Sequence, residues 1–443
     1  MNGILNWFKD SYSVFREELR RILTDSGVMI IFAVAGLGYP LLYNCIYHNG
    51  ILEDTPIAVV DLSHSAESRR YIRKVDATRE LRVVQRCSDM EQVEDLMRQR
   101  KVKGAIYFPE DFGSNIVQGR TATLSIYADM SSFLYYKNLM MGANFVMLDE
   151  MEQIKIERYS AGGMSDQEIS QLIEAVPFDE NNPYNRTFSY SIFFLSAALL
   201  LIIQQVMFYG MIMRTGTARE RGQSYFRLYA DQGKSAVGRI LFGRGMAYWM
   251  LFMIIGVYIA CLVPAMFSLP QRGDFFGIVV LLLFYVTACV CFVSFWSSFF
   301  HRRETVLVTL LFISPIAMFL TGFSWPVTAF PTFWRWFSYI FPSSFACPAF
   351  INLNTAGCDV IQVSELLRNL AIQSGVYILL SMVAGYRKIR LSRAGLKSRR
   401  WLQGGEDSTS AAGKPLSGKC ARKRNFSRLG FVFQGGKILL RRT

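Results

Sequence analysis

The sequence predicts an α-helical polytopic membrane protein with six transmembrane helices and an inserted extracytoplasmic α/β domain. Three observations point to this fold class. The 443 residues are 51% hydrophobic and 14% aromatic, which is too apolar for a globular enzyme alone. Six apolar runs approach or exceed the roughly 20 residues that are needed to cross about 30 Å of hydrocarbon. A long polar segment, in which the hydrophobic period changes, separates the first run from the second.

The apolar runs and the charged stretches between them divide the chain into segments. In order, we expect an amino-terminal segment at 1–25, the first span at 26–47, the extracytoplasmic domain at 48–186, the second span at 187–213, a charged loop at 214–245, spans three to five at 246–269, 275–300 and 305–323, an external or re-entrant aromatic and proline-rich segment at 324–368, the sixth span at 369–386, and a basic tail without fixed structure at 387–443.

Basic residues predict the orientation, because Lys and Arg near span ends concentrate on the cytoplasmic side. The amino-terminal segment, the loop 214–245, the turn at 301–304 and the tail are all basic and fall on one side of a six-span count. The segment 48–186 has 16 Lys/Arg against 22 acids, and long domains cross regardless of charge, so it belongs outside. We therefore expect both termini to be cytoplasmic.

The net charge of +14 is a property of the tail alone. After Tyr386 there are 16 of the 48 Lys/Arg and two acids, whereas the rest of the chain sums to zero. The charge therefore indicates attraction to anionic lipid headgroups rather than a body that binds nucleic acid.

The segment 48–186 alternates short β-rich runs with polar helical ones, which predicts a small α/β domain with some parallel pairing. We expect strands at 55–62, 81–87, 103–109 and 121–129, and helices at 65–77, 88–100 and about 131–175, with Ser65 and Ser88 as helix caps. Asp61, Ser63 and His64 could suggest a catalytic triad, but three residues on one turn are more simply a polar loop.

The cysteines and histidines predict no metal site, because no paired CxxC spacing with His companions occurs. Cys347 and Cys358 fall in the same expected external loop, so either a disulfide or two free thiols is consistent with the sequence.

The loop 214–245 stands between two runs that carry no charge. From Arg214 to Arg244 it contains seven Lys/Arg and two acids. Gly233, Lys234 and Ser235 spell the end of a phosphate-binding loop, but Leu228 stands where the first glycine would be needed. We interpret these letters as a chance match, so any ATP hydrolysis must belong to another polypeptide.

The external segment contains the most distinctive motifs in the chain. GFSWP follows the fifth span, then come a proline-aromatic-tryptophan helix and an FPSS turn, and the outer domain contains PIAVVDLSHSAESRRYIRKVDAT, KGAIYFPEDFGSNI and LSIYAD. Together, from about Phe8 to Arg390, these motifs resemble the permease subunits of ABC-2 type transporters. The segment would then form an external gate, with ordinary interfacial aromatic residues as the alternative; its marker residues are Trp325, Pro326, Pro331, Trp334 and Pro342.

In that family, the loop between spans two and three has a pattern like RERGT-x-x-x-L and forms a coupling helix in a groove of a separate ATPase subunit. The chain departs from this pattern at Gln223 and Ser224, which leaves the detailed contact open. The resemblance implies an ATPase-coupling role for the residues at the matching positions, which are Arg219, Glu220, Arg221, Gly222, Phe226 and Leu228.

The resemblance also implies what surrounds the chain. It would be the non-enzymatic permease of an ATP-driven exporter in a bacterial inner membrane, with no cofactor of its own. Its partners would be membrane lipid, two ATPase subunits that bind ATP and Mg, a second copy or a sister permease packed through spans one, two and five, and a periplasmic adaptor. The substrate, whether drug-like, lipid-like or polysaccharide-like, stays open.

Uncharged polar residues within the spans are candidates for the substrate path, namely Gln204, Gln205 and Asn44. Hydrogen bonding between helices is the alternative. The apolar cores carry no charge, which argues against an ion-gradient transporter. A membrane-anchored receptor or assembly factor, acting through the extracytoplasmic domain, is the alternative function, and co-purification of an ATPase would discriminate between the two.

Overall fold

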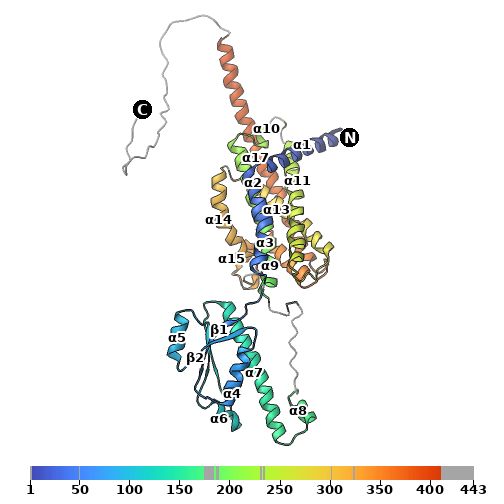
Figure 1. The fold of residues 1–443 in the computed structure, drawn as a ribbon. Coiled ribbons are helices and arrows are strands. Elements are labelled where there is room, and N and C mark those ends of the chain that lie inside the picture. Colours follow the sequence, from blue (N-terminus) through green and yellow to red (C-terminus); the bar gives the residue numbers. More distant parts are fainter. Residues whose placement is uncertain are drawn as a thin grey trace, which may run out of the picture.

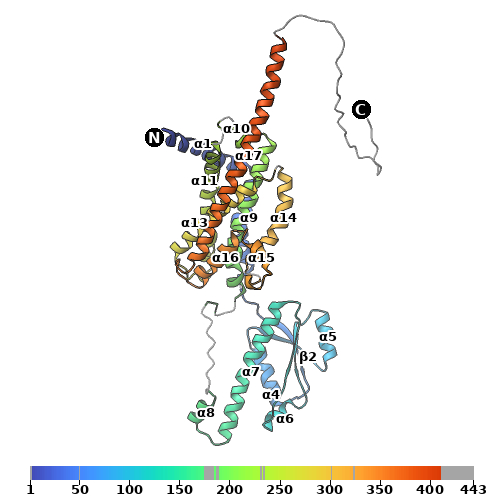
Figure 2. The ribbon, with the colours of Figure 1, turned by 180° about the vertical axis from the view of Figure 1, so that it is seen from behind.

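The structure is a computed structural model that describes residues 2–48, 50–173, 184–185, 189–229, 232, 235–300, 302–322 and 325–410. A helical bundle forms one part, and a small α/β domain lies beyond one end of it (Figure 1). The amino-terminal helix and the carboxyl-terminal end of the last helix lie at the opposite end of the bundle (Figures 1 and 2). This arrangement matches the predicted fold class.

Six helices in the described residues are long and apolar enough to cross a membrane, as predicted. They span Ser26–Ile46, Phe194–Glu220, Ser235–Met266, Phe275–Trp296, Arg303–Leu320 and Ser364–Ala394. The elements that form the bundle are α1 (Asn2–Thr24), α2 (Ser26–Ile30), the π-helical η1 (Ile31–Gly38), α3 (Tyr39–Ile46), α9 (Tyr190–Glu220), α10 (Tyr225–Leu228), α11 (Ser235–Val257), η3 (Tyr258–Leu262), α12 (Val263–Met266), α13 (Phe275–Trp296), α14 (Arg303–Leu320), η4 (Val327–Ala329), α15 (Thr332–Ser338), α16 (Ser343–Phe350), η5 (Ile351–Thr355) and α17 (Ser364–Ser410).

The spans differ in how deeply they lie in the bundle. In α9, 72% of the most apolar stretch is buried, against 22% in the first span and 18% in α14. The main hydrophobic core is built around α9 and α13, with Tyr248, Phe252 and Tyr285 among its largest fully buried side chains. The second span is therefore central, and the first and fifth present most of their surface outwards.

Two helices extend well into the stretch that the sequence assigned to the loop 214–245. α9 continues to Glu220, and α11 begins at Ser235 rather than at Met246. In α11 the physical reason is that two of its charges are paired, with Arg239 bound to Asp10 and Arg244 bound to Glu18. At the end of α9, Arg219 and Glu220 bond to the backbone groups of Ser297 and Arg303. A charged residue ends an apolar run, but it does not end a helix when a partner compensates the charge.

The last helix also continues beyond the expected boundary. The sequence predicted a tail without fixed structure from residue 387, whereas α17 runs to Ser410; residues 411–443 lie outside the described part. Leu, Lys, Arg and Ala are good helix formers, and extending an existing helix avoids the cost of nucleation.

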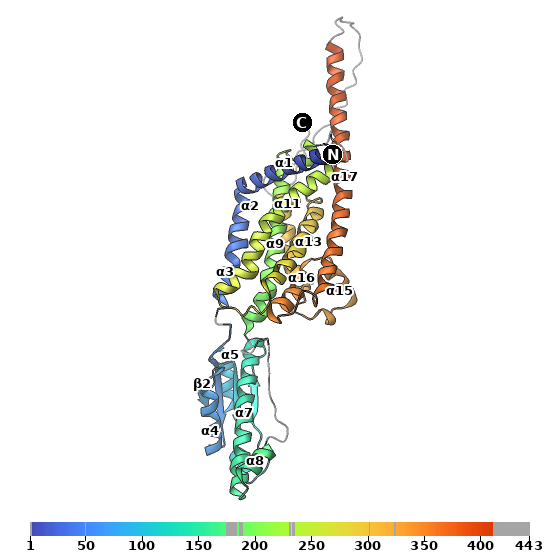
Figure 3. The same cartoon turned by 90° about the vertical axis from the view of Figure 1, so that its right-hand side faces the viewer.

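The amino-terminal segment forms a long helix, α1, which the sequence analysis left unassigned. α1 lies across the end of the bundle (Figure 3) and packs against α11. Val14 and Ile22 are buried, while Leu5, Phe8 and Tyr12 are exposed. A helix that runs across span ends with exposed apolar residues is typical of a helix in the membrane interface.

The external segment folds back into the bundle. Pro331 and Pro342 each immediately precede a short helix, α15 and α16. α16 is almost wholly buried against α9 and α13, as expected for a re-entrant segment, whereas α15 exposes its aromatic face. Cys347 and Cys358 both have free thiols, so of the two alternatives that the sequence left open, free thiols rather than a disulfide are present.

The outer domain contains a four-stranded sheet in the order β2-β1-β3-β4. β1 pairs in parallel with β2 and β3, and β4 is antiparallel to β3. The bounds are β1 (Thr55–Asp61), α4 (Ala66–Asp76), β2 (Leu81–Cys87), α5 (Met90–Arg98), β3 (Gly104–Phe108), α6 (Phe112–Val117), β4 (Ser125–Ala128), α7 (Phe133–Ala161) and α8 (Asp166–Ile173). α4, α6 and α7 cover one face of the sheet, and α5 covers the other (Figure 1).

The turn after β1 has a structural role. Asp61 accepts hydrogen bonds from the backbone N–H of His64 at 3.1 Å and from the hydroxyl of Ser68 at 2.8 Å. Ser65 caps α4 as predicted, whereas α5 is capped by Asp89 rather than Ser88, because the Asp89 carboxylate reaches the N–H of Gln92. Asp61 and His64 therefore form a hydrogen-bonded turn before the Ser65 cap and not a catalytic triad.

Candidate functional site

The connection between α9 and α11 is the candidate coupling site. Gly222 ends α9 with φ +68°, a left-handed conformation that glycine adopts without steric cost. The N–H of Gly222 donates to the carbonyl of Arg219 at 3.0 Å, and the N–H of Gln223 donates to that of Ala218 at 2.8 Å. This pair of bonds is a Schellman motif, which fixes the direction in which the chain leaves the helix.

Arg219 and Glu220 connect the end of α9 to the two neighbouring spans. Arg219 Nη2 donates to the carbonyl of Ser297, the residue that ends α13, at 2.9 Å. Glu220 Oε1 accepts from the N–H of Arg303, the first residue of α14, at 2.9 Å. A carboxylate at this position satisfies one of the free N–H groups of a helix start and interacts favourably with the helix dipole. Arg219 and Glu220 therefore both form hydrogen bonds to other segments of the same chain.

The short helix α10 has an inner and an outer side. Phe226 is 8% exposed and packs with Val14, Val237 and Ile389, which belong to three other helices. Leu228 is 56% exposed, and Arg221 before the helix is also exposed. Of the six predicted coupling residues, Glu220, Arg221 and Leu228 are thus exposed, and Glu220 already accepts the N–H of Arg303.

A buried ion pair lies directly beneath this connection. Glu18 of α1 is 2% exposed and accepts from Arg244 Nε of α11 at 3.3 Å and from the Tyr248 hydroxyl at 3.4 Å. Arg244 also donates to the Thr215 hydroxyl of α9 at 2.8 Å. One carboxylate thus joins α1 to α11, and one guanidinium extends the network to α9.

The cluster around this pair carries more positive than negative charge. Arg214 and Arg219 line the same small cleft as Glu18 and Arg244, and each has a buried nitrogen without a hydrogen-bond partner in the described structure. The Lys388 ammonium, which lies 5.6 Å from the Phe226 ring, is a third buried cation of this kind. Among the described residues that line the cleft, Glu18 is therefore the one carboxylate, and it shares the cleft with Arg214, Arg219 and Arg244.

Tyr225 links the loop to α1. Its ring lies 4.8 Å beneath the Arg21 guanidinium, a cation–π contact. Burial, together with the nearby Glu18 carboxylate, raises the pKa of the Tyr225 phenol, so this side chain stays neutral at physiological pH. The loop is thereby held to the interfacial helix by a contact that does not titrate.

Of the letters Gly233, Lys234 and Ser235, the first two lie outside the described residues. Ser235 begins α11, and its hydroxyl donates to the carbonyl of Gln232 at 3.1 Å. This bond is a local contact at a helix start.

The candidate path residues differ in their surroundings. Gln204 is 2% exposed, and its Oε1 accepts from the N–H of Ser343 at 2.9 Å, so it bonds α9 to the start of α16. Asn44 is 1% exposed and donates to the carbonyl of Pro40 at 2.7 Å. Gln205 is half-buried. For Gln204, the arrangement fits hydrogen bonding between helices better than a place on a substrate path.

The external gate residues form two groups. Trp325 is 61% exposed, Trp334 is 46% exposed, and Pro326 and Pro331 are exposed. Trp334 packs edge-on against Phe337 with ring centroids 5.8 Å apart. Pro342 is buried before α16. The exposed group offers an aromatic surface, whereas Pro342 belongs to the re-entrant helix.

The sequence analysis missed the pair of Glu18 and Arg244 and the packing of α1 across the end of the bundle. One signal was present, because Trp7, Ser11, Val14 and Ile22 recur at helical spacing and face the bundle. Within the described ranges, no group of three His, Cys, Asp or Glu side chains is arranged to hold a metal ion.

Comparison with known families gives one match. A family model described as ABC-2 family transporter protein matches residues 26–383, which is well over half of the chain and includes the outer domain, the first five spans, much of the sixth span and the candidate coupling site. A search of curated proteins found no significant match.

Proposed function

The chain belongs to the ABC-2 family of transporter proteins, a family of multi-pass membrane subunits that associate with ABC ATPases, and from this premise we propose that it is the permease subunit of an ATP-driven exporter. The ATPase is a separate subunit that binds ATP and Mg. The permease moves a drug-like, lipid-like or polysaccharide-like substrate out of a bacterial cytoplasm, with both of its termini on the cytoplasmic side.

The observation that carries this proposal is the outward-facing side of α10. Leu228 and Arg221 are exposed on the fourteen-residue connection, 221–234, between two spans. Burying one leucine side chain contributes about 1.5–3 kcal/mol, so Leu228 can supply a substantial part of the apolar contact with a groove of a partner. Leu228 and Arg221 are therefore the contacts that we assign to the ATPase.

The route from this contact into the membrane runs through α9. Displacement of α10 would act on Gly222 and then on Arg219 and Glu220, which hold the ends of α13 and α14. α14 packs mainly on α9, so it can follow that helix as a rigid body. ATP-driven closure of the ATPases would thus move spans two, four and five together, and a rearrangement of the aromatic segment would open the external side.

We further propose that two permeases pair through the first and fifth spans. Both expose apolar side chains along their length, including Ile30 and Val34 on the first span and Leu311 and Phe312 on α14, all of which are more than half exposed. The partner is a second copy or a sister permease, and a periplasmic adaptor would contact the outer domain.

The test is co-purification of the full chain from membranes of its host. We expect an ABC ATPase to accompany the wild-type protein and to be reduced about tenfold or more by Leu228→Asp, because this change removes an apolar contact worth at least about 1.4 kcal/mol. Ile361→Asp is the matched control, since Ile361 is 83% exposed just before α17 and lies near the opposite end of that span.

Two results would count against the proposal in different ways. If no ATPase accompanies the wild-type protein, the chain acts as a membrane-anchored receptor or assembly factor through its outer domain. If the ATPase accompanies Leu228→Asp as well as the wild type, the exporter assignment survives and the contact residue is wrong.

A further inference from the structure

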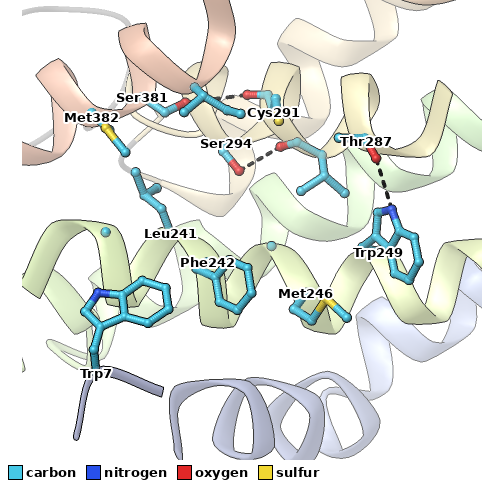
Figure 4. A pocket seen from close by; sticks show the side chains of 14 residues that line it. Trp7, Leu241, Phe242, Met246, Trp249, Thr287, Cys291, Ser294, Ser381 and Met382 are labelled. Carbon is cyan, nitrogen blue, oxygen red and sulfur yellow. Dashed lines mark hydrogen bonds between the residues drawn. The ribbon is translucent and has the colours of Figure 1, made fainter. Parts of the chain in front are cut away.

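A groove of about 500 Å³ lies on the flank of the bundle, with Trp7 near one end and Trp249 near the other (Figure 4). It is formed by α11, α13 and α17 and by Trp7 of α1. No charged side chain is present among its lining residues, which are Trp7, Gly238, Leu241, Phe242, Gly245, Met246, Trp249, Thr287, Val290, Cys291, Ser294, Ile378, Ser381 and Met382.

The hydroxyl groups in the lining are already occupied. Ser294 and Ser381 donate to backbone carbonyls of α13 at 2.7 and 3.5 Å. Thr287 donates to the carbonyl four residues earlier at 2.6 Å and accepts the indole N–H of Trp249 at 3.1 Å (Figure 4). A polar ligand would therefore lose its hydration in the groove and find no free O–H donor among these hydroxyls, whereas a hydrocarbon chain has no hydrogen bonds to water to lose.

The mouth of the groove faces hydrocarbon. Phe242, Met246 and Ile378 are 47, 40 and 41% exposed, and all three belong to helices long and apolar enough to span the membrane. Exposed apolar side chains at this depth lie against lipid tails. A molecule would enter sideways from the bilayer rather than from water.

The length of the groove corresponds to one leaflet. Gly238 and Trp249 are eleven residues apart on α11, or about 16 Å at a rise of about 1.5 Å per residue. Half of a hydrocarbon core of about 30 Å is about 15 Å. Figure 3 shows that α1 lies across the span ends. Trp7 belongs to α1 and its Nε1 lies 4.0 Å from a Cβ atom at Gly238, near the start of α11, which is the depth expected for the headgroup interface.

We propose that the groove binds one acyl chain of a membrane phospholipid from the leaflet next to α1, with the headgroup beside Trp7. The acyl chain then packs between α11, α13 and α17. It also contacts α1, the helix that contains Glu18 of the buried ion pair. The groove is formed by elements other than the first span and α14, which we assign to pairing of permeases, so both surfaces can be occupied at once.

Gly238 provides a way to block the groove. A Cβ atom at this position would have Trp7 Nε1, at 4.0 Å, as its one neighbour within that distance, so a larger side chain fits and occupies the end of the groove. On α17, a Cβ atom at Gly375 would meet nothing within 4 Å, and this residue is not part of the lining. Gly375→Leu is thus a matched control for Gly238→Leu, with the same change in helix propensity.

The experiment uses the full-length protein in vesicles of phosphatidylcholine that contain a small fraction of phosphatidylcholine with a diazirine on one acyl chain. After illumination, labelled peptides are identified by mass spectrometry. We expect labelling to concentrate on peptides that contain 238–249, 287–294 and 378–382. Gly238→Leu should lower this labelling about tenfold relative to wild type, equivalent to about 1.4 kcal/mol, and Gly375→Leu should leave it unchanged.

Three outcomes would overturn the proposal. Equal labelling of the wild type and Gly238→Leu would show that the groove is not the binding site. Wild-type labelling that is no stronger on the lining than on the exposed face of α14 would show ordinary surrounding lipid and needs no variant to interpret. Cross-links from the lining to a second protein chain, with little lipid labelling, would show that a polypeptide fills the groove.

Discussion

Breaking the ion pair between Glu18 and Arg244 is the sharpest test of how the basic end of the bundle is held together. Both side chains are more than nine-tenths buried, and their nearest atoms are 3.3 Å apart. At an effective dielectric constant of about 20, two unit charges at this distance attract each other by about 5 kcal/mol. Removing one partner of a buried pair costs about 3–5 kcal/mol, because the other charge is left uncompensated.

We expect Glu18→Leu to lower the free energy of unfolding by about 3 kcal/mol, at the lower end of this range, since Arg244 keeps its hydrogen bond to Thr215. The double variant Glu18→Leu/Arg244→Met should recover most of the loss, because no uncompensated charge of the pair stays buried. The assay is reversible unfolding of the purified protein in mixed micelles with increasing dodecyl sulfate, followed by circular dichroism.

The control is the neighbouring pair of Glu17 and Arg21, which is one helical turn apart on α1 and has a Glu17 side chain that is 44% exposed. Glu17→Leu should cost no more than about 0.5 kcal/mol. If Glu18→Leu is as mild as this control, or if the double variant is less stable than Glu18→Leu alone, the reasoning about the buried pair is refuted.

Three further predictions concern helix ends. Gly222→Ala should lower the stability of the α9 end by about 1–2 kcal/mol, because φ +68° suits glycine, and Gly222→Asn should cost less; equal hydrogen exchange at Gln223 in both variants would contradict this. Glu220→Ala should speed exchange of the Arg303 amide several-fold, equivalent to about 1 kcal/mol, while Glu220→Asp keeps part of the protection; an unchanged rate in the alanine variant would exclude the cap. Gln204→Leu should reduce the free energy of unfolding by about 1–3 kcal/mol, because the buried N–H of Ser343 loses its acceptor, and substrate preference in a transport assay should stay unchanged; altered preference at unchanged stability would instead favour a path role.

The features that repeat along the chain could be predicted from the order of its residues alone. Six apolar runs give six spans, because the length of a span is set by the thickness of the bilayer and not by its neighbours. The alternation of β-rich and polar runs gives the outer domain, and the expected runs at 55–62 and 81–87 agree with β1 and β2 to within a residue. Local patterns determine these elements, since each depends on residues that are close in sequence.

The ends of α9 and α11 at the connection 221–234 could not be predicted, because they depend on contacts between residues that are far apart in the sequence. Arg244 reads as the end of a loop until Glu18, 226 positions away, is seen to bind it. In the same way, Glu220 resembles a residue for a partner, yet its carboxylate holds the first N–H of α14. A charge can lie inside a helix bundle when a distant residue compensates it, and only the tertiary structure brings the two together.

The sequence by itself therefore determined the class of the protein, its six spans, the strands of its outer domain and the location of the candidate coupling connection between α9 and α11. The tertiary structure decided which side of that connection faces outwards: Phe226 packs into the chain, and Leu228, two residues later, is exposed. The physical reason is that hydrophobicity marks both residues alike, whereas burial depends on the neighbours that α1, α11 and α17 supply. Gly222 illustrates the contributions of both the sequence and the tertiary structure. Its position in the sequence indicated the connection, and its left-handed φ in the folded chain showed that it ends α9.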